Sequence, residues 1–200
     1  MPEPAPTPFI SVCICTYNGA ERIGHVLEAL GRQTDQGDRW DVLVVDNASR
    51  DATADVVRRG IEAHLPQRAR LVREEQPGVM YARRKAAMEA RGPVIAFLDD
   101  DNVPAPDYLE RLLEVWPRYP KAAIMGGKVK PHWIGTPTPL GEAVAHFALA
   151  LCDRGDEPFA YQDVTGGPAG AGMVVSRDLM HRIFREEDLA QTVTGRTGTG

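Results

Sequence analysis

An apolar run at residues 94–98 ends directly in three adjacent aspartates, Asp99, Asp100 and Asp101. Adjacent carboxylates repel one another, so each raises the cost of ionising its neighbours. If the extended geometry of a strand persists, Asp99 and Asp101 point to one face and Asp100 to the other. Paired carboxylates suit Mg²⁺ or Mn²⁺ rather than zinc, and such an ion would bridge to substrate phosphates. We therefore expect Asp99 and Asp101 to ligate a divalent metal. The competing interpretation is an acidic loop that caps the next helix, with Asp107 as N-cap.

Two other apolar runs also end in polar side chains. Thr16 and Tyr17 follow the run at residues 10–15 and could line a base pocket, the tyrosine by stacking on the ring. Asp46 follows the run at residues 41–45 and could accept a hydrogen bond from a base N–H or a ribose hydroxyl. Both positions are therefore candidates for contact with a nucleotide.

Two adjacent arginines, Arg83 and Arg84, lie in an alanine-rich segment at residues 79–90. Guanidinium groups bind phosphates and base carbonyls as planar, charged forks. Arg83 is the better ligand candidate. Arg84 is equally well explained by a solvated helix face that pairs with Glu75 or Glu89.

Strand-like and helix-like segments alternate along the first 130 residues. This alternation implies right-handed βαβ units and an α/β, Rossmann-like fold with a mostly parallel sheet flanked by helices. Ligands bind at the carboxyl ends of the strands in such sheets, so the polar residues after the first, second and fourth strands should converge. Strands are expected at residues 10–15, 41–45, 69–73, 94–98 and 122–129, and helices at residues 21–32, 51–61, 79–90 and 107–116.

The pattern also divides the chain into parts. Residues 1–8 alternate prolines with other residues and predict a flexible tail, and residues 9–130 carry the strand–helix alternation. The pattern weakens over residues 131–200, where residues 140–151 are compatible with a helix and GGPAGAG forms a glycine-rich turn. The last six residues, GRTGTG, have the composition of an open loop, so we expect the chain to be cut before a further functional element.

Composition restricts the class of protein. The chain has 200 residues, of which 43% are hydrophobic and 26% charged, as in a globular domain. The net charge of −5 argues against a nucleic-acid partner, which would require a basic face. No apolar run reaches the roughly 20 residues of a transmembrane helix, and the start lacks the features of a secretory signal. Together with an odd count of three cysteines that have no framework spacing, this predicts a cytoplasmic protein, either free or peripheral to the membrane.

The order and spacing of five segments resemble the family 2 glycosyltransferases, which have the GT-A fold. Cys15 stands where proline is common in the family, and Arg84 stands where asparagine is usual. The resemblance runs from residue 10 to about residue 177. The segments that carry it are SVCICTYNGAERIGHVLEALGRQ, VVDNASRDAT, GVMYARRKAAMEARG, FLDDDNVPAPDYL and GPAGAGMVVSR.

The resemblance implies a role for each matching position. Residues 9–130 would bind the nucleotide sugar, and residues 131–200 would form an incomplete acceptor half. Asp46 would contact the base or ribose, Asp99 would lie near the ribose, and Asp101 would ligate Mn²⁺ or Mg²⁺ on the diphosphate. The expected contacts of the nucleotide sugar are Thr16, Tyr17, Asn18, Asp46, Arg83, Asp99 and Asp100, and the expected metal ligands are Asp101 and Asp99.

The implied reaction moves a sugar, with inversion, from a nucleoside-diphosphate sugar to an acceptor hydroxyl, as in polysaccharide biosynthesis. UDP- and dTDP-sugars are the donors that the resemblance suggests, and the acceptor would be a glycan, a lipid-linked molecule or a small molecule. The family's base is a late acidic residue, for which Glu187 and Asp188 are weak candidates here, because a solvated helix face explains them better. We therefore expect the base to lie beyond Gly200.

Two alternatives remain open at this point. A sugar nucleotidyltransferase is also an α/β metal enzyme, but it normally has a glycine-rich basic loop after the first strand, which CTYNGAERI lacks. A truncated or degenerate module could bind the nucleotide sugar without turnover.

Overall fold

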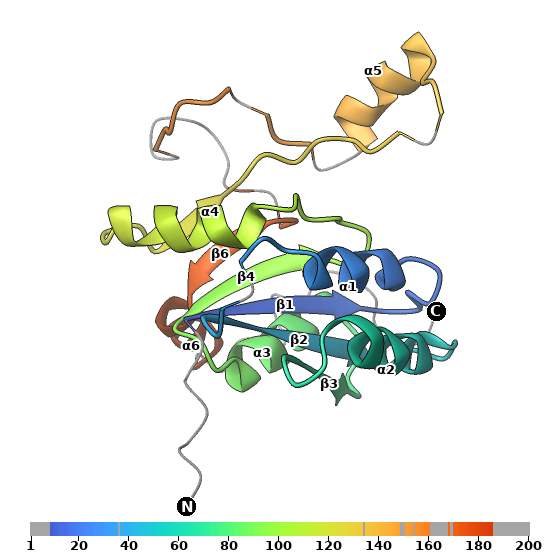
Figure 1. Cartoon of the computed structure of the whole chain (residues 1–200), viewed down its shortest axis with the longest axis vertical. Coiled ribbons are helices and arrows are strands. Elements are labelled where there is room, and N and C mark those ends of the chain that lie inside the picture. Colours follow the sequence, from blue (N-terminus) through green and yellow to red (C-terminus); the bar gives the residue numbers. More distant parts are fainter. Residues whose placement is uncertain are drawn as a thin grey trace, which may run out of the picture.

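The computed structural model describes residues 9–35, 37–133, 135–148, 151–153, 155–160, 168 and 170–185. Strands and helices alternate along most of this part of the chain (Figure 1). The strands are β1 (Ile10–Thr16), β2 (Trp40–Asn47), β3 (Ala69–Glu74), β4 (Val94–Asp99), β5 (Ile124–Gly126) and β6 (Met173–Ser176). The helices are α1 (Ile23–Gly31), α2 (Thr53–His64), α3 (Val79–Glu89), α4 (Tyr108–Val115), α5 (Pro139–Ala148) and α6 (Arg177–Arg185), with a 3₁₀ turn, η1 (Trp116–Arg118).

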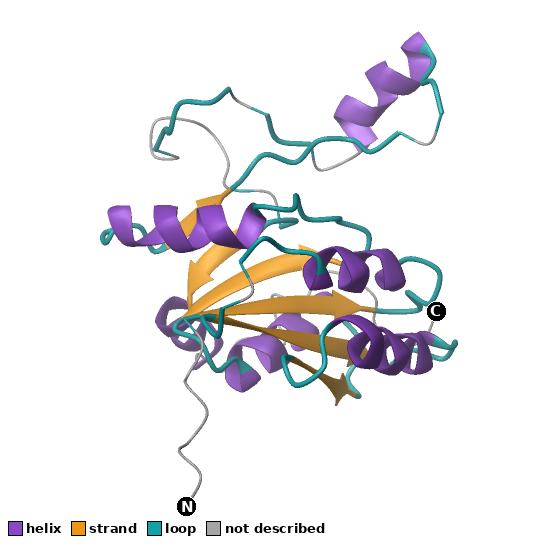
Figure 2. Ribbon diagram, in the orientation of Figure 1, coloured by secondary structure: helices purple, strands orange, loops and turns teal. Residues whose placement is uncertain are grey.

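One six-stranded sheet, in the order β3-β2-β1-β4-β6-β5, forms the centre of the molecule (Figure 2). The four strands β3, β2, β1 and β4 run parallel, whereas β6 is antiparallel to both β4 and β5. The predicted α/β fold with a mostly parallel sheet and flanking helices is therefore confirmed.

Helices cover both faces of the sheet, and the strands are correspondingly apolar on both sides. In β2, Val42 and Val44 pack with the buried faces of α1, α2 and α4, whereas Leu43 and Val45 pack with α3 and α6. Burying such a side chain contributes about 1.5–3 kcal/mol. This two-sided burial explains why the strands are near-continuous apolar runs, as parallel strands usually are.

The second part of the chain differs from the sequence-based expectation. The strand predicted at residues 122–129 is reduced to three residues, Ile124–Gly126, at the edge of the sheet. The apolar residues after the glycine-rich turn, which the sequence did not mark as a strand, form β6 between β4 and β5. The predicted division at residue 130 stays a prediction, although β6 from the second part pairs with β4 from the first.

The segment that carries α5 lies apart from the sheet, at the top of Figure 1. A bridge between Val129 and Cys152 joins its two arms. The helix expected at residues 140–151 is observed as Pro139–Ala148, and residues 149 and 150 are not among the described ones. No helix in the described part of the chain is long and apolar enough to cross a bilayer.

Candidate active site

The carboxyl ends of three neighbouring strands bring the predicted site residues together. The strand register places Cys15 of β1 beside Asp99 of β4, and Thr16 of β1 beside Asp46 of β2. The loops that follow these strands therefore begin at the same edge of the sheet. The predicted convergence of the polar residues after the first, second and fourth strands is observed, although these residues lie far apart in the sequence.

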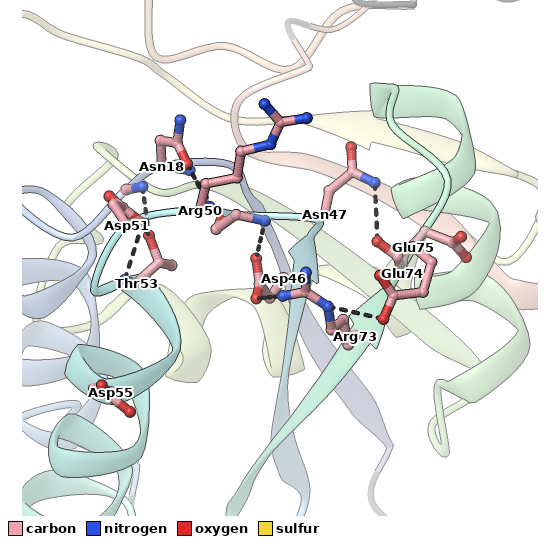
Figure 3. A network of polar contacts seen from close by, with 12 residues as sticks. Asn18, Asp46, Asn47, Arg50, Asp51, Thr53, Asp55, Arg73, Glu74 and Glu75 are labelled. Atoms are coloured by element: carbon pink, nitrogen blue, oxygen red, sulfur yellow. Dashed lines mark hydrogen bonds and ion pairs between the residues drawn. The ribbon is translucent and has the colours of Figure 1, made fainter. Parts of the chain in front are cut away.

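Hydrogen bonds join the loop after β1 to the loop after β2 (Figure 3). The amide of Asn18 donates to Oγ of Ser49 over 2.9 Å, and Oδ1 of Asn18 accepts from the amide of Arg50 over 2.9 Å. The next amide, that of Gly19, donates to Oγ1 of Thr53 over 2.8 Å. Asn18 has a φ of 47°, a left-handed conformation that asparagine tolerates better than most residues. These contacts give Asn18 a structural function, and its contact with a nucleotide stays a prediction.

Asp46 is buried at the end of β2, and its carboxylate is shared with an arginine that sequence reasoning did not single out. Oδ1 accepts from the amide of Ser49 over 3.0 Å, and Oδ2 accepts from Nη1 of Arg73 over 2.9 Å. Arg73 also donates from Nε to Glu75 over 2.9 Å (Figure 3). The signal for Arg73 is its register opposite Asp46 on β3, which is visible only once the strands are paired.

The three aspartates at the end of β4 and in the turn after it have different surroundings. Asp99 is half-buried, Asp100 is buried and Asp101 is exposed. Burial raises the pKa of Asp99 above its ordinary value. The nearby Arg83 opposes this shift, while the charges of Asp101 and Asp100 add to it. A carboxylate whose charged form is disfavoured in this way gains from a bound cation.

Asp100 faces the loop after β1. Its carboxylate accepts a hydrogen bond from Oγ1 of Thr16 over 2.6 Å and two from Arg22, each over 3.0 Å. The strand alternation expected for the three carboxylates does not extend past Asp99, because β4 ends there and Asp100 and Asp101 lie in the turn that follows. Contact of Asp100 or Thr16 with a nucleotide stays a prediction, as it does for the half-buried Tyr17.

Arg83 lies where the end of β4 meets the glycine-rich segment. Its guanidinium carbon is 5.6 Å from the centroid of the Phe97 ring, a cation–π contact. A Cβ atom added at Gly170 would lie 2.7 Å from Nη2 of Arg83, so the end of this flexible side chain would have to shift. The charge of Arg83 opposes the effect of burial on Cys15, which raises the pKa of that thiol to about 12. Arg83 is half-buried, whereas Arg84 is exposed.

The donor set near the aspartates fits a hard cation that substrate completes. Within the described ranges, no group of three or more His, Cys, Asp or Glu side chains could hold a metal ion by itself. Magnesium, however, is usually held by one or two carboxylates together with substrate phosphates. The side-chain oxygen of Asn102 is buried without a hydrogen-bond partner, so a further oxygen next to the aspartates is unsatisfied. Asp99 and Asp101 would be the protein's ligands.

The candidates for the catalytic base are not placed by the structure. Glu187 and Asp188 lie outside the described residues, which end at Arg185. Their assignment stays a prediction.

Comparison with known proteins shows which family the chain matches. The family model described as Glycosyl transferase family 2 matches residues 11–184. Glycosyltransferase AglE of Haloferax volcanii is 39% identical over 104 residues, which are 52% of this chain and 34% of that protein. Validoxylamine A glucosyltransferase of Streptomyces hygroscopicus subsp. jinggangensis is 39% identical over 108 residues, which are 53% of this chain and 25% of that protein. The chain thus spans a quarter to a third of the length of these relatives.

Solved structures show the same fold. The crystal structure of S. aureus TarS 1-349 has a TM-score of 0.65 at 18% identity, over 88% of this chain and 49% of that one, a likeness of fold alone. The mannosyltransferase PcManGT from Pyrobaculum calidifontis, in complex with GDP-Man and Mn²⁺, has a TM-score of 0.56 at 32% identity. That match covers 66% of this chain and 38% of that one. The expected GT-A arrangement is confirmed.

Proposed function

Because the chain belongs to the family 2 glycosyltransferases, we propose that it transfers a sugar from a nucleoside-diphosphate sugar to an acceptor hydroxyl, with inversion and with the help of Mn²⁺ or Mg²⁺. The observation that carries the proposal is the meeting of Asp46, Arg83 and the aspartates at the end of β4 at one edge of the sheet. A UDP- or dTDP-sugar is the proposed donor. The proposed acceptor is a glycan, a lipid-linked molecule or a small molecule.

The relatives support a nucleotide-sugar donor and a divalent metal. The mannosyltransferase with 32% identity was solved with GDP-Man and Mn²⁺. In this chain, oxygen ligands are present in Asp99 and Asp101. Family membership makes the sugar nucleotidyltransferase a less suitable interpretation, because the matched family transfers sugars. A module that binds the donor without turnover stays as the second outcome of the test below.

The proposed reaction gives the residues of the site different roles. Bound at Asp99 and Asp101, the metal would supply Lewis-acid stabilisation for the charge on the departing diphosphate. Arg83 would bind the nucleotide through its cationic fork. Asp46 and Tyr17 would orient the base or ribose. A carboxylate beyond α6, with Glu187 and Asp188 as the candidates within this chain, would accept the proton from the attacking hydroxyl.

Calorimetry with UDP, with and without Mn²⁺, tests the proposal. We expect the wild-type chain to bind UDP more tightly with Mn²⁺, and Asp101→Ala to lose this metal-dependent binding while keeping its fold. Asp55→Ala is a matched control, because this exposed aspartate of α2 pairs only at the surface with Arg58. Undiminished metal-dependent binding by Asp101→Ala would reject the ligand assignment. Tight binding without sugar transfer would favour the binding module.

A further inference from the structure

The middle aspartate of the acidic run is engaged by the protein itself. Asp100 is 8% exposed, and both of its carboxylate oxygens accept hydrogen bonds. Arg22 donates from Nε to Oδ1 and from Nη2 to Oδ2, which is the two-pronged geometry that gives arginine–carboxylate pairs their directional strength. Thr16 adds a third donor to Oδ2. Arg22 and Thr16 thus donate three hydrogen bonds to the carboxylate of Asp100.

These three residues come from three different elements of the site. Thr16 is the last residue of β1, Arg22 is the N-cap residue of α1, and Asp100 directly follows β4. The connection is therefore long-range: 78 residues separate Arg22 from Asp100 in the sequence. It fixes the loop after β4 to the start of α1.

Gly19 shows how closely the loop after β1 wraps around Asp100. A Cβ atom at this position would overlap both Oγ1 of Thr16 and Oδ2 of Asp100. Gly19 is also held by its amide, which donates to Thr53 over 2.8 Å. Only a residue without a side chain lets the loop approach this carboxylate.

The position of Asp100 makes this contact relevant to the metal. Asp99 and Asp101, the proposed ligands, are its immediate neighbours, and consecutive Cα atoms are only about 3.8 Å apart. A side chain that anchors the middle residue therefore restricts the backbone on both sides. The Arg22 side chain is 45% exposed, but that of Asp100 is only 11% exposed, so the connection contributes to stability as well as to the position of the loop. The melting temperature is therefore measured beside the binding readouts.

We propose that Arg22 and Asp100 form a positioning pair, which holds the carboxylates of Asp99 and Asp101 in the arrangement that binds the metal–diphosphate. The inference rests on the proposed function. It also changes the expectation for Asp100, which acts through its neighbours rather than by contact with the nucleotide. Asp100 and Arg22 are accordingly positioning residues and not catalytic ones.

A double-mutant cycle in the full chain tests the pair, with Asp100→Asn, Arg22→Met and the double variant. The readouts are the affinity for UDP with Mn²⁺ and with EDTA by calorimetry, the EPR signal of Mn²⁺ at saturating UDP, and the melting temperature. Residues that orient metal ligands typically contribute 10–100-fold to metal affinity, so each single variant should lose about tenfold in Mn²⁺-dependent UDP affinity. Because the pair acts as a unit, the double variant should lose no more than either single one.

Two further variants separate positioning from general loosening. Arg22→Lys keeps the charge but not the fork, so it should recover part of the lost Mn²⁺-dependent affinity. The control is the ion pair of Asp55 and Arg58 on α2, where both side chains are 66% exposed. Asp55→Asn with Arg58→Met should leave Mn²⁺-dependent binding unchanged.

The outcomes discriminate between the explanations. Loss of affinity confined to the Mn²⁺ titration, with a broadened EPR signal, supports the positioning pair. Wild-type Mn²⁺-dependent affinity in Asp100→Asn overturns it, and so does an equal loss with Mn²⁺ and with EDTA, which indicates direct nucleotide contact or a loosened fold. A wild-type chain without any Mn²⁺-dependent UDP binding overturns the proposed function itself, and the inference with it.

Discussion

Nη1 of Arg73 lies 2.9 Å from Oδ2 of Asp46, whose side chain is only 2% exposed, whereas that of Arg73 is 46% exposed. The arginine at the end of β3 therefore covers the carboxylate at the end of β2. A base or ribose that contacts Asp46 must share this carboxylate with Arg73 or displace the guanidinium.

Replacing Arg73 should destabilise the fold, because a buried carboxylate would lose a charged partner. We expect Arg73→Ala to lower the free energy of unfolding by about 1–3 kcal/mol, the usual cost of leaving a buried polar group short of a partner. The measurement is urea unfolding. Arg58→Ala is the control, since Arg58 pairs with Asp55 where both side chains are 66% exposed, and should cost at most about 0.5 kcal/mol. Equal losses would show that Asp46 does not depend on Arg73.

Gly19 should not tolerate even one added methyl group. The Cβ atom of alanine would overlap Oγ1 of Thr16 and Oδ2 of Asp100, so the loop or the carboxylate must move. Forced overlap of this kind typically costs about 1–3 kcal/mol, which thermal or urea unfolding of Gly19→Ala would detect. At Gly127 nothing lies within 4 Å of the added atom, and Gly127→Ala should be close to neutral. Similar stability of the two variants would contradict the described packing around Asp100.

Gly170 should affect the binding of the nucleotide through Arg83. The added Cβ atom in Gly170→Ala would lie 2.7 Å from Nη2 of Arg83 and should displace the guanidinium. If Arg83 binds the nucleotide, both Gly170→Ala and Arg83→Ala will weaken UDP binding in calorimetry, whereas Arg84→Ala, at an exposed position, will not. Weaker binding by Arg84→Ala than by Arg83→Ala would reverse the assignment of the two arginines.

Local patterns were sufficient to predict the first four strands. The continuous apolar runs before Thr16, Asp46 and Asp99 predict buried parallel strands, and the structure has them within two residues of the expected bounds. The convergence of their loops follows from the topology of parallel sheets.

Long-range pairing explains what the sequence did not reveal. The strand β6 has only four residues, and in the sequence it looks like any short apolar run. Its place beside β4 depends on antiparallel pairing with residues that are distant in the sequence. Arg73 and Arg22 look like surface charges until the strand register and the loop contacts are known. The sequence shows that Asp100 lies between Asp99 and Asp101, but it does not show which residues Asp100 contacts.

The most direct test of the metal assignment is a crystal soaked in Mn²⁺ and UDP, with data collected at the manganese absorption edge. The account predicts an anomalous peak within coordinating distance of the Asp101 carboxylate and of the diphosphate, with Asp99 beside it. Bound UDP with no anomalous peak near Asp99 and Asp101, or with manganese elsewhere, would contradict it.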